Sequence, residues 1–389
     1  MAQTIDVTPT KQIRKKRRSS VLKKCGTMDP VFLILVFSLL CFGLVMLFSA
    51  SFARAYYYEG NSFYYISKQA FYAVIGIAVM LIASRVDYHI FRKFSIFLYF
   101  FSFILLVIVL FMPGDANGIR RWINLGPFGQ FQPSELMKFA LITIFGSMIA
   151  ANYSKMKTFR YGVVPFVLLL APVIFLMYLE PHLSGIILMC SIAAVMMFVG
   201  GTRPKWFVML GVLAGAALLY ILLFKGNYMS GRAFYWLHPF SDTLDKTMQT
   251  DQSLLAIGSG GFFGLGLGQS KQKFMYLPEV QNDFIFAIVC EELGVVGAIA
   301  VILLFVLLCY KGFEIASKSP DKFGALLCVG IVAQIGIQAL LNIAVVTNTV
   351  PNTGISLPFF SYGGTALVMQ LAEMGVVLNV SRHAMTQKL

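Results

Sequence analysis

Long apolar runs constrain the fold of this chain more than any other feature. A segment of about 20 mainly apolar residues is long enough to cross a bilayer as a helix. Ten segments of the 389-residue chain reach or approach this length: 31–53, 69–84, 95–112, 133–152, 162–179, 184–200, 206–224, 284–308, 324–346 and 361–380. Such runs must be helical in hydrocarbon, and the alternating pattern of a membrane barrel is absent. The sequence therefore predicts an all-α membrane protein with ten transmembrane helices.

The composition supports this prediction. Charged residues make up only 12% of the chain and hydrophobic residues 58%, whereas a soluble domain carries about 25% charged residues. An ordinary soluble domain is therefore excluded. The six cysteines show no metal-site spacing, and none lies in a segment predicted to be outside the cell. Neither a disulfide framework nor a structural zinc site is expected.

The distribution of positive charge predicts the orientation. If the N-terminus is cytoplasmic, 21 Lys and Arg residues lie in inside segments and nine in outside segments. By the positive-inside rule, both termini are then cytoplasmic. The predicted organisation is a basic tail (1–30), a single ten-helix membrane domain (31–380) and a second tail (381–389). The basic tail is expected to attract anionic lipid, and no nucleic-acid partner is expected because aromatic residues are not interleaved with the charges.

Two external loops are long enough to carry function under this topology. The larger, 225–283, connects the seventh and eighth helices, and the smaller spans 113–132. Loops longer than about 12 to 15 residues are usually functional or disordered. Because the larger loop is rich in aromatic residues, we expect it to pack on the outer membrane face.

Glu135 and Lys138 form a candidate pair at the start of the fourth predicted helix. Pro133 suits the first helical turn, and the i, i+3 spacing places the carboxylate and the ammonium on one face. Charged residues inside a membrane are costly and usually face a cavity or a partner. The pair is either an ion pair that anchors the helix or a cavity-facing pair that positions an anionic substrate, and the two readings are compatible.

Asp283 lies where the large loop enters the eighth helix, with Glu279 four residues earlier. A carboxylate at the membrane boundary is partly desolvated, which raises its pKa and suits a general base. The alternative is a helix N-cap, for which Asp is a preferred residue. Glu291 and Glu292 follow deeper in the helix and are expected to accept hydrogen bonds from neighbouring helices.

Two arginines in the loop 113–132 run against the charge trend. Arg120 and Arg121 are expected outside, where they would contact anionic lipid headgroups or a phosphorylated substrate. Trp122 suits an interfacial position. His182, at a break between helices, has no companion ligand nearby in the sequence, so a metal-binding role is not favoured.

Several motifs together resemble the SEDS family (shape, elongation, division and sporulation), and the resemblance covers nearly the whole chain. They are RWI at 121–123, QPSE at 132–135, GLGQS at 266–270, LPE at 277–279, DFIFA at 283–287, EELG at 291–294 and LPFFSYGG at 357–364. Within the family, the segment 268–278 is more similar to the FtsW and SpoVE members than to RodA, which favours a role in division or sporulation over elongation.

The resemblance implies a bacterial cytoplasmic-membrane enzyme, enriched at the septum, that polymerises peptidoglycan strands from lipid II on the outer face. Asp283 matches the family's essential aspartate, and Glu135 and Lys138 match its functional pair. Arg120, Arg121 and Glu279 are added as candidate substrate-binding residues. The implied partners are a class B penicillin-binding protein and other divisome or elongasome proteins. A divalent cation, Mg²⁺ or Mn²⁺, is a further expectation without an assigned site.

The sequence departs from the family pattern at one loop, and it leaves two alternative functions open. Glu180-Pro181-His182 stands where members commonly have Gln-Pro-Asp, so any role of that aspartate is in doubt here. The alternatives to a glycosyltransferase are a lipid II flippase and a scaffold that recruits the penicillin-binding protein. A flippase is disfavoured because no internal repeat is visible between the two halves.

Overall fold

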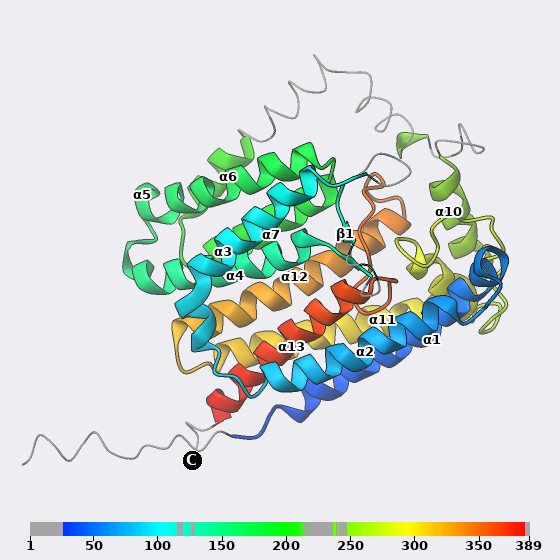
Figure 1. Ribbon diagram of the computed structural model, residues 1–389, viewed down its shortest axis with the longest axis horizontal. Helices are drawn as coiled ribbons and strands as arrows, with labels where there is room; N and C mark the ends of the chain where they lie inside the picture. The colour runs from blue at the N-terminus through cyan, green and yellow to red at the C-terminus, as the bar shows by residue number, and fades with distance from the viewer. Residues whose placement is uncertain are drawn as a thin grey trace, which may run out of the picture.

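The computed structural model describes residues 26–114, 120–124, 126, 129–212, 215, 236–238, 240 and 247–385. In this part of the chain, long helices pack side by side in one bundle (Figure 1). The bundle helices are α1 (Pro30–Glu59), α2 (Tyr64–Ala83), α3 (His89–Leu110), α4 (Pro133–Asn152), α6 (Val164–Leu179), α7 (Leu183–Val199), α11 (Ile285–Ser317), α12 (Lys322–Val346) and α13 (Gly364–Met385). Eight segments of the described chain are long and apolar enough to cross a membrane, and α7 is a shorter apolar helix. The protein is a multi-pass membrane protein.

The helices follow the predicted apolar runs closely. The bounds of α4 match the predicted span 133–152, while α1 and α11 extend beyond 31–53 and 284–308. The start of α1 is fixed by Asp29, whose carboxylate accepts a hydrogen bond from the Phe32 amide at 3.0 Å, and by Pro30 in the first turn. The predicted span 206–224 is helical as far as residue 212 and otherwise lies largely outside the described residues, as does the tail 1–30.

Helix α12 lies at the centre of the bundle. It packs against α4, α7, α11 and α13, and α2 packs on α13 while α3 packs on α4. The outer helices α2 and α3 expose many large apolar side chains, including Phe71, Val74, Phe97 and Phe100. Exposed apolar surface of this extent is expected where helices face lipid rather than water.

The two ends of the described chain meet at one end of the bundle. The Gly26 amide donates to the Arg382 carbonyl at 3.1 Å, and the Asp29 amide donates to Ser381 Oγ at 3.1 Å. The short η2 (Tyr153–Lys155) and α5 (Phe159–Gly162) lie on this side in Figure 1. The other end carries α10 (Met248–Gly260) and a two-stranded antiparallel ladder of β1 (Ile123–Asn124) and β2 (Gln130–Phe131), a small addition to the predicted all-α class.

Helix α11 is broken at Gly294, whose φ of 66° is not helical. The loop before α11 supplies backbone partners at this break. The Leu265 amide donates to the Glu291 carbonyl at 3.0 Å, and the Val295 amide donates to the Gly261 carbonyl at 3.0 Å. A helix broken in an apolar environment needs such replacement partners. Within the glycine-rich segment 258–268, Gly260 and Gly264 pack directly against the α11 backbone at this break, where a Cβ atom would lie 2.0 Å from the Cys290 carbonyl oxygen and 2.1 Å from the Glu292 carbonyl oxygen.

Candidate functional site

A cavity of about 940 Å³ lies at the end of the bundle that carries the strand ladder. Four sequence-predicted residues line it together: Asp283, Glu135, Lys138 and Arg121. They come from the start of α11, the first turns of α4 and the loop before β1. Residues far apart in the sequence thus share one polar chamber.

Asp283 is positioned by its backbone. Its carbonyl accepts a hydrogen bond from Asn342 Nδ2 at 2.8 Å, and its amide donates to the Glu279 carbonyl at 3.3 Å. The N-cap of α11 is Phe284, without a side-chain hydrogen bond, so the predicted alternative of Asp283 as a helix cap is wrong. A Cβ atom added to Gly354 would lie 3.2 Å from Asp283 Oδ2, which shows how closely this loop approaches the carboxylate.

The surroundings of Asp283 raise its pKa to about 6. Desolvation by burial is the main cause, the negative charge of Glu279 adds to it, and Arg121 opposes it. The rise expected from the sequence is confirmed. A carboxylate with this pKa is still mostly ionised at neutral pH, yet it is more basic than an exposed aspartate.

Glu135 and Lys138 form a buried ion pair. Glu135 Oε1 lies 2.8 Å from Lys138 Nζ, and their exposed fractions are 9% and 3%. Lys138 also donates to Gln338 Oε1 at 3.3 Å, and Gln338 Nε2 in turn donates to the Ser356 carbonyl at 3.1 Å. The pair links α4 to α12 and also lines the cavity. Its role in positioning an anionic substrate stays a prediction.

Arg121 and Arg120 have different surroundings. Arg121 lines the cavity, and its guanidinium donates to the carbonyls of Glu180, at 3.3 Å, and Pro181. Arg120 does not line the cavity and donates from Nη1 to the Leu110 carbonyl at 2.8 Å. The α6–α7 connection therefore holds Arg121, and not Arg120, at the cavity.

Glu279 lies beside the cavity rather than in its wall. It pairs with Arg54 of α1 at 2.7 Å and accepts a hydrogen bond from Asn282 Nδ2 at 2.6 Å. Together with Arg54 it lines a neighbouring pocket of about 240 Å³. Glu279 influences Asp283 through its charge, and its own carboxylate is occupied by protein partners.

A family model described as a cell cycle protein family, FtsW/RodA/SpoVE, matches residues 30–386. The chain belongs to this family. It is 41% identical over 359 residues to stage V sporulation protein E of Bacillus subtilis (strain 168), covering 92% of this chain and 97% of the relative. It is 38% identical over 363 residues to "Probable peptidoglycan glycosyltransferase FtsW" of Geobacter sulfurreducens (strain DL-1 / KN400), covering 92% and 96%.

Solved structures show the same fold. A chain from a peptidoglycan synthase complex, studied for the structural coordination of polymerization and crosslinking, superposes with a TM-score of 0.76 at 27% identity. The match covers 92% of this chain and 98% of that one. RodA of Thermus thermophilus, a rod shape determining protein, gives a TM-score of 0.67 at 27% identity, covering 91% and 97%.

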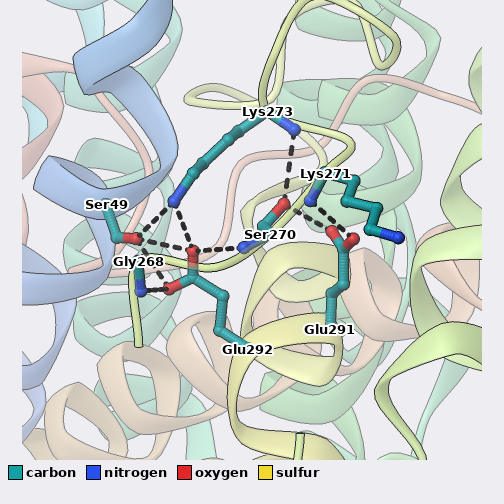
Figure 2. Close-up of polar contacts among 7 residues, drawn as sticks. All are labelled: Ser49, Gly268, Ser270, Lys271, Lys273, Glu291 and Glu292. Atoms are coloured by element: carbon teal, nitrogen blue, oxygen red, sulfur yellow. Dashed lines mark hydrogen bonds and ion pairs between the residues drawn. The ribbon is translucent and has the colours of Figure 1, made fainter. Parts of the chain in front are cut away.

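A buried polar network joins the loop before α11 to the bundle (Figure 2). Lys273 Nζ pairs with Glu292 Oε1 at 2.8 Å, and both side chains are fully buried. Ser49 of α1 donates to Glu292 Oε2 at 2.6 Å, and Ser270 donates from Oγ to Glu291. The expected hydrogen bond from a neighbouring helix is confirmed for Glu292, which accepts from Ser49. It is wrong for Glu291, because the donors to its carboxylate, Ser270 Oγ and the Lys271 amide, come from the loop before α11. From the sequence, Lys273 is only one of the nine basic residues in predicted outside segments, and its burial beside Glu292 could not be predicted.

Sequence reasoning also missed Glu373 and the tyrosines of the cavity. Glu373 lies fully buried on α13 and accepts a hydrogen bond from Gln334 Nε2 at 2.9 Å. A carboxylate inside the apolar run 361–380 was a signal that could have found it. Tyr65 and Tyr362 line the cavity and pack edge to face. Tyr362 belongs to the motif LPFFSYGG at 357–364, but the motif alone does not reveal that its side chain lines the cavity.

The described part of the chain does not offer a preformed metal centre. No group of three or more His, Cys, Asp or Glu side chains lies close enough there to hold an ion. Glu279, the carboxylate whose charge acts on Asp283, is already paired with Arg54. A divalent cation would therefore need most of its ligands from a substrate or from water, as Mg²⁺ often does.

Proposed function

We propose that this protein is an inverting peptidoglycan glycosyltransferase that polymerises glycan strands from lipid II at the outer face of the bacterial cytoplasmic membrane. The observation that carries the proposal is the shared cavity, which brings Asp283, Lys138 and Arg121 together. Glycosyl transfer from a lipid diphosphate needs a base and cations. The name of the FtsW relative, a probable peptidoglycan glycosyltransferase, supports the same activity.

In the proposed reaction, the acceptor sugar hydroxyl attacks the anomeric carbon of the growing strand. Asp283 takes the hydroxyl proton as the new carbon–oxygen bond forms. The bond to the lipid diphosphate breaks, and the diphosphate leaves with the electron pair. One carboxylate base suffices for this single displacement with inversion, whereas retention would need a second carboxylate as nucleophile.

Lys138 and Arg121 are the cations that compensate the charge of the leaving diphosphate. Both line the cavity, and Lys138 is buried, so its interaction with an anion is weakly screened. A divalent cation remains a separate proposal, bound mainly by diphosphate oxygens, and no step above depends on it.

We further propose ten transmembrane helices with both termini cytoplasmic. Thr202 Oγ1 donates to the Gly162 carbonyl at 3.2 Å, so the end of α7 lies on the side of the chain ends. Ser253 Oγ donates to the Val346 carbonyl at 2.8 Å, so α10 lies on the opposite side. The two sides require a further crossing between residues 202 and 248, and we assign it to the predicted span 206–224, most of which lies outside the described residues. The positive-inside rule then places the cavity outside.

The proposed partner is a class B penicillin-binding protein, and the proposed site of action is the division septum or the spore wall. The likeness to a chain of a peptidoglycan synthase complex supports a partner, and the likeness to SpoVE and FtsW supports the role. Lipid II as substrate, and other divisome or elongasome proteins as further partners, belong to the same proposal.

The test is polymerisation of purified lipid II by the wild type and by Asp283→Asn, with the partner present. Asp283→Asn keeps the shape of the side chain but removes the base, so we expect folded protein and a loss of about 100-fold or more in rate. Glu314→Gln is the matched control, because Glu314 pairs with Lys311 and Lys318 near the opposite end of α11. Near-normal polymer from Asp283→Asn would refute the catalytic assignment and favour a scaffold.

A further inference from the structure

The N-terminus of α7 forms part of the cavity wall. His182 is the N-cap residue, and it lines the cavity together with Ser184 and Gly185. Helix α4 packs beside α7 and contributes Ser134 to the same wall. A Cβ atom added to Gly185 would lie 3.0 Å from His182 Cε1, so the absence of a side chain there makes room for the imidazole.

Three polar atoms of this wall are buried without a hydrogen-bond partner. Within the described chain, no group satisfies Ser134 Oγ, His182 Nδ1 or Ser184 Oγ. The exposed fractions of these residues are 4%, 9% and 3%. Buried polar atoms in folded proteins nearly always have partners, and these three belong to residues that line one cavity, so they indicate a place for the acceptor atoms of a ligand.

The electrostatics of this wall favour an anion. Burial is the main cause that lowers the pKa of His182 to about 3, and the positive charges of Arg121 and Lys138 lower it further. His182 is therefore neutral and can donate one N–H. The first amides of α7 also have no acceptor within their own helix, and they carry the positive end of its dipole.

The neighbouring carboxylates do not oppose an anion strongly. Glu135 is paired with Lys138 at 2.8 Å. Burial raises the pKa of Glu180 to about 8, with Arg121 opposing, so its carboxyl is mostly neutral at pH 7. Asp283, which also lines the cavity, is the one cavity carboxylate whose charge the proposed reaction requires.

We propose that Ser134, His182 and Ser184 form a subsite that binds the phosphate oxygens of a lipid-linked diphosphate. The inference rests on the proposed function and assigns a place to the leaving group of that reaction. Hydroxyl and imidazole groups donate to the oxygens, while Lys138 and Arg121 compensate the charge. Sugar hydroxyls could also accept these hydrogen bonds, but two adjacent cations and a helix N-terminus favour phosphate.

The test measures binding without turnover. The full-length protein in detergent is titrated with radiolabelled undecaprenyl diphosphate in the absence of any acceptor. We expect His182→Leu and Ser184→Ala each to weaken binding about tenfold, because each removes one hydrogen bond to a charged group. His182→Asn keeps an N–H donor and should stay within about threefold of the wild type.

Ser191→Ala is the matched control, because Ser191 lies on the same helix and donates to its own Ile187 carbonyl at 2.8 Å. It should bind like the wild type. If His182→Leu does not fold, Ser134→Ala and Ser184→Ala decide the question. Wild-type affinity in both serine variants would overturn the subsite, and so would unchanged diphosphate binding combined with a raised KM for lipid II, which would assign the wall to the sugars.

A competition experiment distinguishes two ligands that carry the same chemical group, a lipid-linked diphosphate and free inorganic diphosphate. Inorganic diphosphate that displaces the lipid ligand, with the same sensitivity to Ser184→Ala, would support recognition of phosphate oxygens from either source. No displacement at millimolar concentration, with Ser184→Ala still weakening the lipid ligand, would support a lipid-linked diphosphate alone. Asp283→Asn keeps Ser134, His182 and Ser184 and removes a negative charge from the cavity, so it should bind the lipid diphosphate at least as tightly as the wild type while making no polymer. A failed subsite and a failed catalytic assignment therefore give different results.

Discussion

Asp283 combines accessibility to a cavity with a desolvated carboxyl group. Its pKa of about 6 arises mainly from burial and secondarily from Glu279. A local reading of the sequence could predict the direction of this shift, because Asp283 stands beside Phe284 and Phe286 at the membrane boundary. It could not decide between a base and a helix cap, since that depends on where α11 begins.

The pH dependence of polymerisation follows from this pKa. Asp283 is a base only when ionised, so kcat/KM should fall about tenfold per unit as the pH drops below about 6, and it should level off above. Initial rates of polymerisation between pH 5 and 8 check this. A flat profile over that range, with the protein folded throughout, would contradict a role for Asp283 as the base.

The Glu135–Lys138 pair predicts a non-additive pattern of stability. Glu135→Ala or Lys138→Ala leaves one buried charge without its partner, which costs about 3 to 5 kcal/mol. The double variant removes both charges and should unfold at a higher temperature than the less stable single variant. Thermal unfolding in detergent gives the stabilities, and lipid II polymerisation should be impaired in all three. Normal polymerisation by both single variants would show that the pair only anchors α4.

At the scale of elements, apolar runs and proline positions predicted most of the helices. The span 133–152 with Pro133 in its first turn matches α4. What local patterns could not predict are the partners of distant residues. Ser49 and Glu292 are 243 positions apart in the sequence, yet they are hydrogen-bonded to each other. Lys273 is buried because it forms an ion pair with the same Glu292 carboxylate. Arg120 and Arg121 are adjacent in sequence, yet only their loop geometry separates their roles.

The network of Figure 2 predicts a large difference between two nearby lysines. Lys273→Met leaves the buried Glu292 without its ion-pair partner, so we expect a loss of about 3 to 5 kcal/mol in stability. Lys271→Met is the control, because Lys271 bonds Glu291 through its backbone amide while its side chain is exposed. Thermal unfolding of the two variants makes the comparison, and equal melting temperatures would argue against a stabilising network.

At the scale of the whole molecule, the contact between the two ends of the described chain constrains the topology most. Gly26 and Arg382 are hydrogen-bonded to each other, which requires an even number of crossings between them. Charge counting alone predicted the same arrangement. It could not predict the cavity, because the chamber is lined jointly by α2, α4, α7, α12 and the loops before β1, α11 and α13, which are far apart in the sequence.

Cysteine labelling tests the proposed orientation. In a background without native cysteines, Phe263→Cys should react with a membrane-impermeant maleimide on intact cells, because Phe263 is exposed in the loop beside α10. Lys157→Cys, exposed between η2 and α5, should react only after permeabilisation. The reverse pattern would show that the bundle has the opposite orientation in the membrane, with the cavity on the cytoplasmic side.

The break in α11 has a consequence for how the protein is made. Residues 261–266, which supply the backbone partners at Gly294, precede α11 in the chain. They leave the ribosome first and, in the proposed orientation, have already reached the outer side when α11 enters the membrane. The broken helix can thus find its hydrogen-bond partners during insertion, without waiting for any segment that is synthesised later.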